Sequence, residues 1–111
     1  MTRLPNAEQA SLDVRKLEDY CLSPSHPRGR HKARVFREAL GIGPEDAVWL
    51  RDILLGAAHS AEVLAIGSDV WGAYWRLDVP IQRQTKSAVV RTIWIVGTGE
   101  SRPALVTCWV L

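Results

Sequence analysis

The sequence is that of a small, mildly basic chain. Its 111 residues fall within the size range of one domain, and 47% of them are hydrophobic, which is enough apolar surface for a single core. A net charge of +2 is too small to indicate a nucleic-acid partner by itself. No stretch approaches the roughly 18 apolar residues of a membrane span, and the first ten residues contain no apolar run typical of a signal peptide. We therefore expect one domain over residues 1–111, located in the cytoplasm and without a membrane partner.

A first helix is predicted near the N-terminus. Asp13 can cap it, because an aspartate side chain accepts hydrogen bonds from the amides of the first turn. Val14, Leu17 and Cys21 then recur at intervals of three and four, as one face of a helix requires. Two prolines within residues 22–27 disfavour helical backbone and end it in a loop.

Two further helices are predicted before the middle of the chain. The second runs over 29–40 and is stopped by Gly41, and the third begins near Pro44 and ends within 56–59. The apolar residues of both repeat at helical spacing, as Val35, Phe36, Ala39 and Leu40 in the second and Leu50, Ile53, Leu54 and Ala57 in the third.

From Ala61 the apolar period changes to two, which predicts strands. The runs are 61–66, 70–79, 88–96 and 104–111. Residues 97–101 indicate a hairpin turn, and 82–87 a longer polar connection. We expect an α+β fold in which two or three N-terminal helices pack on one face of a C-terminal antiparallel sheet of about four strands. Trp75, Leu77 and Val79 should lie on the covered face.

The last hairpin also predicts a register. Centred on residues 99–100, it places Thr92 about opposite Thr107. Trp94 and Trp109 are then expected on that same face, to within one residue.

The strongest local charge lies in residues 28–37. The basic residues there are Arg28, Arg30, Lys32, Arg34 and Arg37. On a helical wheel Lys32 falls in the apolar stripe, where an ammonium must reach solvent, pair with a carboxylate or point into a polar cleft. With His31 it could form a corner that attracts a phosphate near a helix N-terminus. The alternative is a first-turn lysine that simply reaches water.

Three histidines are candidates for proton transfer, because an imidazole titrates at about 6.5. His26 and His31 are close enough in sequence to share one cleft, although a capping role also suits His26. His59 follows a helix and is expected to interact with its last carbonyl groups.

Polar residues on the predicted strands have two explanations. Arg91 interrupts an apolar set, so it either lies on the solvent face of the sheet or reaches a charged partner, and Arg76 and Asp78 raise the same question. Cross-strand ion pairing is the favoured explanation for at least one of the three. Thr92 and Thr107 could donate hydroxyl groups to a phosphate, but threonine is also a good strand former.

The two cysteines, Cys21 and Cys108, show no metal-binding spacing, and we expect buried free thiols. The sequence leaves open whether the two cysteines form a disulfide. The sequence contains no glycine-rich phosphate loop, serine elbow or metal-ligand cluster, so we expect neither a cofactor nor a metal. Core packing is favoured over base stacking for the tryptophans, although Trp71, Trp94 and Trp109 could border a cleft or a partner.

Several segments carry a resemblance to a known family. They are 4–7 (LPNA), 20–27 (YCLSPSHP), 32–33 (KA), 92–94 (TIW) and 102–107 (RPALVT). With them the chain resembles, over nearly its whole length, an uncharacterised bacterial domain family found as small free-standing proteins and as C-terminal tips of polymorphic toxins. The end of the chain, Cys108 to Leu111, departs from the alanine-tyrosine-proline-like ending usual in that family.

The toxin setting and the order of helices before strands are similar to barnase-like and RelE-like ribonucleases, and they imply metal-independent cleavage of RNA. By chemistry and position, His31 and His26 would transfer protons, Lys32 and Arg91 would stabilise charge, and Thr92 and Thr107 would orient the phosphate. Arg28, Arg30 and Trp94 are the candidate substrate contacts.

Other functions remain open from the sequence. The chain could be a binding module, such as an immunity or regulatory partner, whose basic helix recognises an acidic protein encoded nearby. It could also be a homodimer that buries a tryptophan-rich sheet face.

Overall fold

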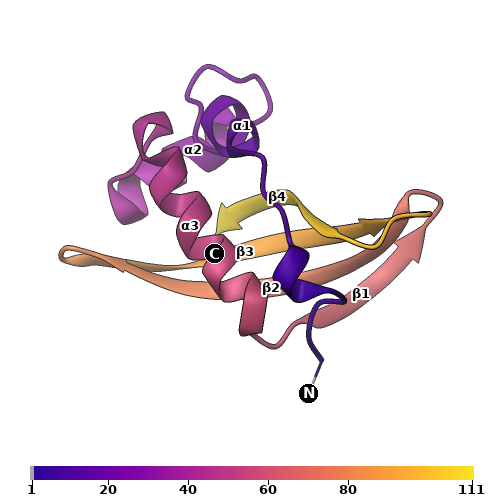
Figure 1. The fold of residues 1–111 in the computed structure, drawn as a ribbon. Coiled ribbons are helices and arrows are strands. Elements are labelled where there is room, and N and C mark those ends of the chain that lie inside the picture. The colour runs from indigo at the N-terminus through magenta and orange to yellow at the C-terminus, as the bar shows by residue number, and fades with distance from the viewer. Residues whose placement is uncertain (1) are drawn as a thin grey trace.

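The computed structural model describes residues 2–111 and has helices packed on one face of a twisted sheet (Figure 1). The helical half consists of η1 (Ala7–Gln9), α1 (Val14–Lys16), η2 (Leu17–Cys21), α2 (Arg30–Leu40), η3 (Pro44–Asp46) and α3 (Ala47–Ser60). The sheet consists of β1 (Leu64–Asp69), β2 (Gly72–Arg83), β3 (Lys86–Gly97) and β4 (Pro103–Val110), antiparallel and in that spatial order. The expected α+β class is confirmed.

The helix ends follow local chemistry. The Asp13 carboxylate accepts a hydrogen bond of 3.0 Å from the amide of Arg15, so it caps α1 as expected. Helix α1 continues as the π-helical turn η2 to Cys21. Helix α2 ends at Gly41, whose φ of 69° favours glycine and whose amide donates to the Arg37 carbonyl.

Strands β2 and β3 form a long hairpin. Their pairing is unbroken from Gly72 with Gly97 to Arg83 with Lys86, so the turn consists of residues 84–85 alone. The expected longer connection over 82–87 is wrong, because Gln82 and Ser87 continue the ladder as a paired, exposed couple. The prediction failed because the solvated tip of a hairpin has the same polar composition as a loop.

One extra residue interrupts the pairing of β3 with β4. Near the turn, Trp94 pairs with Leu105, in the register expected from the sequence. The preceding residue, Ile93, pairs with Thr107, so Val106 remains unpaired as a β-bulge. Every pair beyond the bulge is shifted by one residue.

This shift corrects the predicted faces. Thr92 pairs with Cys108, and not with Thr107. Because side chains alternate along a strand, Thr107 and Trp109 lie on the opposite side of β4 from Cys108. Trp94 and Trp109 are therefore on opposite faces, although the hairpin predicted one shared face.

The core lies between the helices and the covered face of the sheet. Its buried side chains include Leu17, Phe36, Leu40, Leu50 and Leu54 from the helices and Leu77, Val79, Val90, Trp94 and Leu105 from the strands. Leu77 and Val79 are on the covered face, as predicted. No helix in residues 2–111 has the length and apolar character needed to cross a membrane.

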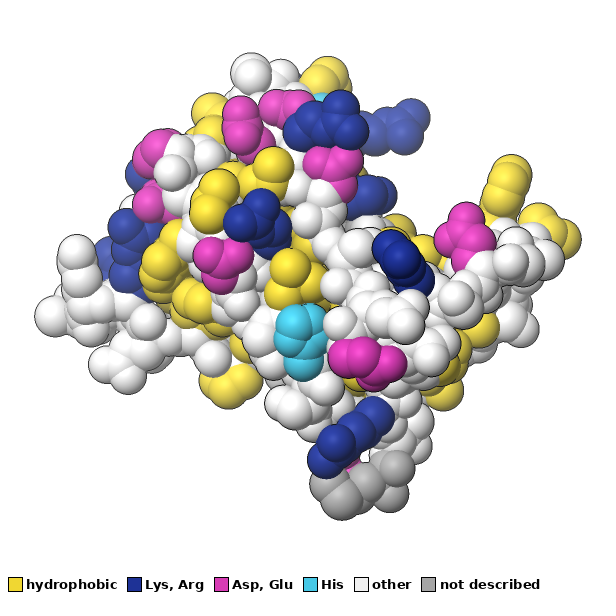
Figure 2. Space-filling view, viewed as in Figure 1, with side chains coloured by type: hydrophobic (Ala, Val, Ile, Leu, Met, Phe, Trp, Pro, Cys, Tyr) yellow, Lys and Arg dark blue, Asp and Glu magenta, His cyan; other side chains and the backbone are white. Residues whose placement is uncertain are grey.

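The helical half and one tip of the sheet differ in surface character. Lys and Arg side chains, interspersed with Asp and Glu, cover the helical half, whereas hydrophobic side chains protrude at one tip of the sheet (Figure 2). Val70 and Trp71, in the turn between β1 and β2, are 81% and 73% exposed. The basic character predicted for residues 28–37 therefore lies on the helical side of the molecule.

Candidate functional site

The first turn of α2 lies beside β4, which is one of the two edge strands of the sheet. The Lys32 ammonium donates a hydrogen bond of 2.9 Å to the Thr107 hydroxyl. It also lies 5.2 Å from the ring centroid of Tyr20 and 5.4 Å from that of Trp109. We call Lys32, Tyr20, Thr107, Trp109 and the nearby His26 the Lys32 corner. The lysine does point toward the sheet, as the sequence predicted.

A close backbone approach brings the elements of this corner together. A Cβ atom added to Gly29 would lie 2.1 Å from the carbonyl oxygen of Tyr20. Only glycine therefore lets the start of α2 pack this closely against η2. The bulge at Val106 supplies the other side of the corner, because it turns Thr107 away from the buried Thr92.

The charge of Lys32 has no carboxylate partner within residues 2–111. The Thr107 oxygen accepts one of its protons, and the faces of the Tyr20 and Trp109 rings attract the ammonium through their quadrupoles. The side chain is half-buried, so it keeps contact with solvent. This arrangement suits an anion that approaches from outside.

His26 is held in a defined orientation on Tyr20. The two ring centroids are 4.7 Å apart, and the His26 Nδ1 atom accepts hydrogen bonds of 3.0 Å from the amides of Arg28 and Gly29. A neutral imidazole that accepts at Nδ1 carries its proton at Nε2. In this arrangement His26 is a hydrogen-bond donor, and a role as proton acceptor would require it to break both amide contacts.

Two buried thiols lie behind the corner. Cys21 and Cys108 are free, and the Cys21 Sγ atom lies 3.9 Å from the Thr107 hydroxyl. Interaction with the Cys108 thiol, together with Thr107 and the charge of Lys32, lowers the pKa of Cys21 to about 6. The same thiol contact, together with burial, raises the pKa of Cys108. Neither thiol reaches solvent.

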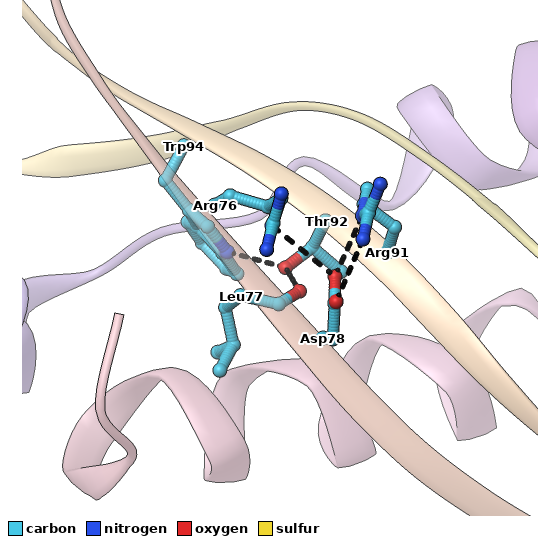
Figure 3. Close-up of polar contacts among 6 residues, drawn as sticks. All are labelled: Arg76, Leu77, Asp78, Arg91, Thr92 and Trp94. Carbon is cyan, nitrogen blue, oxygen red and sulfur yellow. Dashed lines mark hydrogen bonds and ion pairs between the residues drawn. The ribbon is translucent and has the colours of Figure 1, made fainter. Parts of the chain in front are cut away.

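Arg91 forms an ion pair with Asp78 on the sheet (Figure 3). Its Nε and Nη2 atoms donate hydrogen bonds of 2.9 and 3.0 Å to the two oxygens of Asp78, and Arg76 lies 3.8 Å from the same carboxylate. The hydrogen bonds between the two side chains lower the pKa of Asp78 and raise the pKa of Arg91. Arg91 also pairs in register with Trp109, which connects this ion pair to the Lys32 corner. The cross-strand explanation is therefore confirmed.

Thr92 and Trp94 belong to the core, and this corrects their expected roles. The Thr92 hydroxyl donates a hydrogen bond of 2.7 Å to the Leu77 carbonyl and accepts one of 2.8 Å from the Trp94 indole (Figure 3). Both side chains have no exposed surface. They cannot orient a phosphate or contact a substrate, because the helices cover that face of the sheet.

The structure does not join His31 to the Lys32 corner. His31 is exposed and lines a groove on another side of α2, together with Arg30 and Arg34. Within residues 2–111 its ring forms no hydrogen bond with the protein, and no group of three His, Cys, Asp or Glu side chains is placed to hold a metal. Arg28 is exposed beside the His26 loop. The predicted site residues are thus spread over the Lys32 corner, the groove, the core and, for Arg91 and Arg28, the sheet ion pair and the exposed loop.

The comparison with known families concerns almost all of this structure. Residues 3–111 match the model of a family described as "Domain of unknown function (DUF6883)". The chain belongs to this family. The resemblance to an uncharacterised domain family is thus confirmed, and the DUF6883 match includes both the corner and the groove. No curated protein and no solved structure matches the chain.

Sequence reasoning overlooked two residues of this DUF6883 domain that surround the lysine. Tyr20 lies within the segment that carries the resemblance, but its ring had no predicted partner. Trp109 was expected at a cleft or partner surface, without a contact to Lys32. A signal was available in each case, since an aromatic ring is a common neighbour of a half-buried cation.

Proposed function

We propose that this domain binds and cleaves RNA, without a metal ion, at the Lys32 corner. The observation that carries the proposal is the half-buried Lys32 ammonium, which is held by Thr107 between two rings and has no carboxylate partner in residues 2–111. A fixed cation of this kind binds a phosphate and stabilises the extra negative charge of the pentacoordinate transition state. A toxin-type role in the cytoplasm agrees with this chemistry.

The aromatic rings of the corner favour RNA over a small anion. Trp109 and Tyr20 are both half-buried, so each presents part of its surface next to the ammonium. Single-stranded RNA is commonly held by bases stacked on aromatic side chains beside cations. The His26 Nε2–H group is available to donate to a phosphate oxygen, because its Nδ1 atom is occupied.

Proton transfer falls to His31 in this proposal. It is exposed on the groove side of α2, next to Lys32 in the chain but outside the Lys32 corner, so in this proposal the RNA passes across the first turn of α2 to meet both side chains. His31 takes the proton of the 2′-hydroxyl, the 2′-oxygen attacks phosphorus, and the bond from phosphorus to the 5′-oxygen breaks. The leaving oxygen takes a proton from water, and His31 returns its proton to the hydroxide. The products are a 2′,3′-cyclic phosphate and a 5′-hydroxyl.

The test is cleavage of a fluorescent single-stranded RNA by the purified protein in the presence of a chelator. Lys32→Met should lower the rate by at least about 100-fold, the effect expected for loss of a transition-state contact. His31→Ala should lower it by about 100-fold as well. The matched control is Arg102→Ala, an exposed arginine that lines neither the corner nor the groove.

Two further arms make the result decisive. The same oligonucleotide made of DNA should stay intact, because it lacks the attacking hydroxyl group. Expression in a bacterial host should arrest growth, and Lys32→Met should restore it. The proposal fails if RNA stays intact at high protein concentration, or if Lys32→Met cleaves RNA as fast as Arg102→Ala does.

A further inference from the structure

A second surface lies on the side of α2 away from the Lys32 corner. A groove of about 570 Å³ runs between α2 and the segments 22–24 and 42–44. This volume is within the roughly 300–1,000 Å³ typical of ligand sites. None of the five residues of the Lys32 corner lines it. His31, the proton acceptor proposed above, lies on its rim, but the other lining residues have no role in the proposed reaction.

The rim of the groove is basic. Arg30, His31 and Arg34 line it, and all three are exposed. Within residues 2–111 neither Arg30 nor Arg34 forms an ion pair, whereas Arg37 is paired with Glu45 at 2.9 Å. Glu38 is the one acidic side chain among the lining residues. The unpaired charges on the rim are therefore positive, and they complement an acidic ligand.

The floor of the groove is aliphatic. Its accessible apolar surface comes from the exposed Pro24 and the half-buried Pro44, which lie over the buried side chains of Leu22, Ala33 and Ile42. The lining contains no Phe, Tyr or Trp side chain. Bases of single-stranded RNA are usually held by aromatic rings, which this molecule places in the Lys32 corner instead. An aliphatic floor suits the leucine or isoleucine of a peptide.

We propose that this groove binds an acidic segment of another protein through an aliphatic anchor residue. The anchor lies against Pro24 and Pro44, and flanking carboxylates pair with Arg30 and Arg34. A groove with an apolar floor and a charged rim is the usual form of site for an amphipathic helix. The two arginines determine the sign of the charge on the partner, since charge complementarity mainly determines specificity.

The probe is a short fluorescent peptide of glutamates in which leucines recur at every third and fourth position. Fluorescence anisotropy should show saturable binding to the wild-type protein. The double variant Arg30→Ala/Arg34→Ala should bind at least about tenfold more weakly, because two charge-assisted contacts are removed. The control Arg3→Ala/Arg102→Ala removes the same charge from exposed arginines outside the groove and should bind normally.

A second peptide, with glutamine in place of each leucine, should not bind, because it lacks the anchor. The proposal is overturned if no peptide binds, if the glutamine peptide binds equally well, or if both double variants lose affinity alike. It is also overturned if single-stranded RNA displaces the peptide and itself requires Arg30 and Arg34. The measurement involves no RNA cleavage, so its outcome does not depend on the proposed ribonuclease activity.

Discussion

The ammonium of Lys32 lies 2.9 Å from the hydroxyl of Thr107, although 75 residues separate the two in the chain. This contact joins the start of α2 to the edge strand β4. Measuring its strength therefore tests both the packing of α2 on the sheet and the geometry of the Lys32 corner.

A double-mutant cycle should measure this contact. Lys32→Met keeps most of the aliphatic stem, and Thr107→Val keeps the shape of the strand residue. Because the donor is charged and half-buried, we expect a coupling free energy of about 1 kcal/mol. Urea denaturation of the four proteins measures it. A coupling of zero would mean that the contact does not form in solution.

The close approach at Gly29 predicts a large effect of a single methyl group. Gly29→Ala places a carbon 2.1 Å from the Tyr20 carbonyl oxygen, so η2 and α2 must separate. We expect a loss of about 2 kcal/mol or more in unfolding free energy, as for overpacked sites. Thermal melting monitored by circular dichroism measures it.

Gly56→Ala is the matched control, since this glycine lies within α3 and has no heavy atom within 4 Å of its added Cβ. There alanine should stabilise the protein by about 0.5–1 kcal/mol, because glycine is a poor helix former. Equal effects at the two positions would contradict the close approach at Gly29.

The buried hydrogen bonds of Thr92 predict a purely structural effect. Thr92→Val leaves the Trp94 indole N–H and the Leu77 carbonyl without this partner, at a cost of about 1–3 kcal/mol. Thr92→Ser retains the hydroxyl and should recover much of that loss. Chemical denaturation measures the stability of both variants. A serine variant as unstable as the valine variant would show that the methyl group matters more than the hydrogen bonds.

The ion pair of Asp78 with Arg91 should make stability depend on acidity. Because the Arg91 hydrogen bonds lower the pKa of Asp78 below its ordinary 3.8, the folded protein binds this proton less readily than the unfolded chain. The contribution is present above about pH 3.8 and is lost as the pH falls through the lowered pKa. Arg91→Gln should cost up to about 1 kcal/mol at pH 7, and the difference from wild type should shrink in acid. An unchanged difference at low pH would exclude the ion pair as its cause.

The thiol pair predicts a second dependence in a different range. The pKa of Cys21 is lowered from 9.0 to about 6, mainly by the Cys108 thiol. Between these values the folded protein holds fewer protons than the unfolded chain, so unfolding free energy should rise with pH. The gain is lost as the pH falls through 6. Cys21→Ser should flatten this rise, and Cys108→Ala should reduce it by removing the main contact. Denaturation at a series of pH values, under reducing conditions, measures the slope.

The sequence predicted the helical half well because its signals are local. Asp13 as a cap, Gly41 as a stop and the apolar spacing of α2 depend on residues within one or two turns. The placement of Lys32 against the sheet was also predictable, since a lysine in an apolar stripe needs a polar neighbour. Thr107 was named only as a candidate phosphate contact, and its hydrogen bond with Lys32 was not predicted.

The errors concern information that is not local. A bulge depends on how the edge strand meets the helices, and no residue type marks Val106 as unpaired. The face shared by Thr107 and Trp109 with Thr92 and Trp94 was predicted wrongly for that reason. The separation of His26 from His31 has a similar origin, because it depends on the path of the loop that precedes α2.

The unpaired Val106 determines which chemistry the surface presents. If Val106 paired regularly with Ile93, the alternation of β4 would place Thr107 beneath the helices and Cys108 outside. The Cys108 thiol would then face the solvent next to Lys32, in place of the Thr107 hydroxyl and the Trp109 indole. The bulge thus shifts the alternation of the strand by one residue. This one-residue difference, and not a change of side chain, decides whether a hydroxyl and an indole or an oxidisable thiol face the solvent beside Lys32.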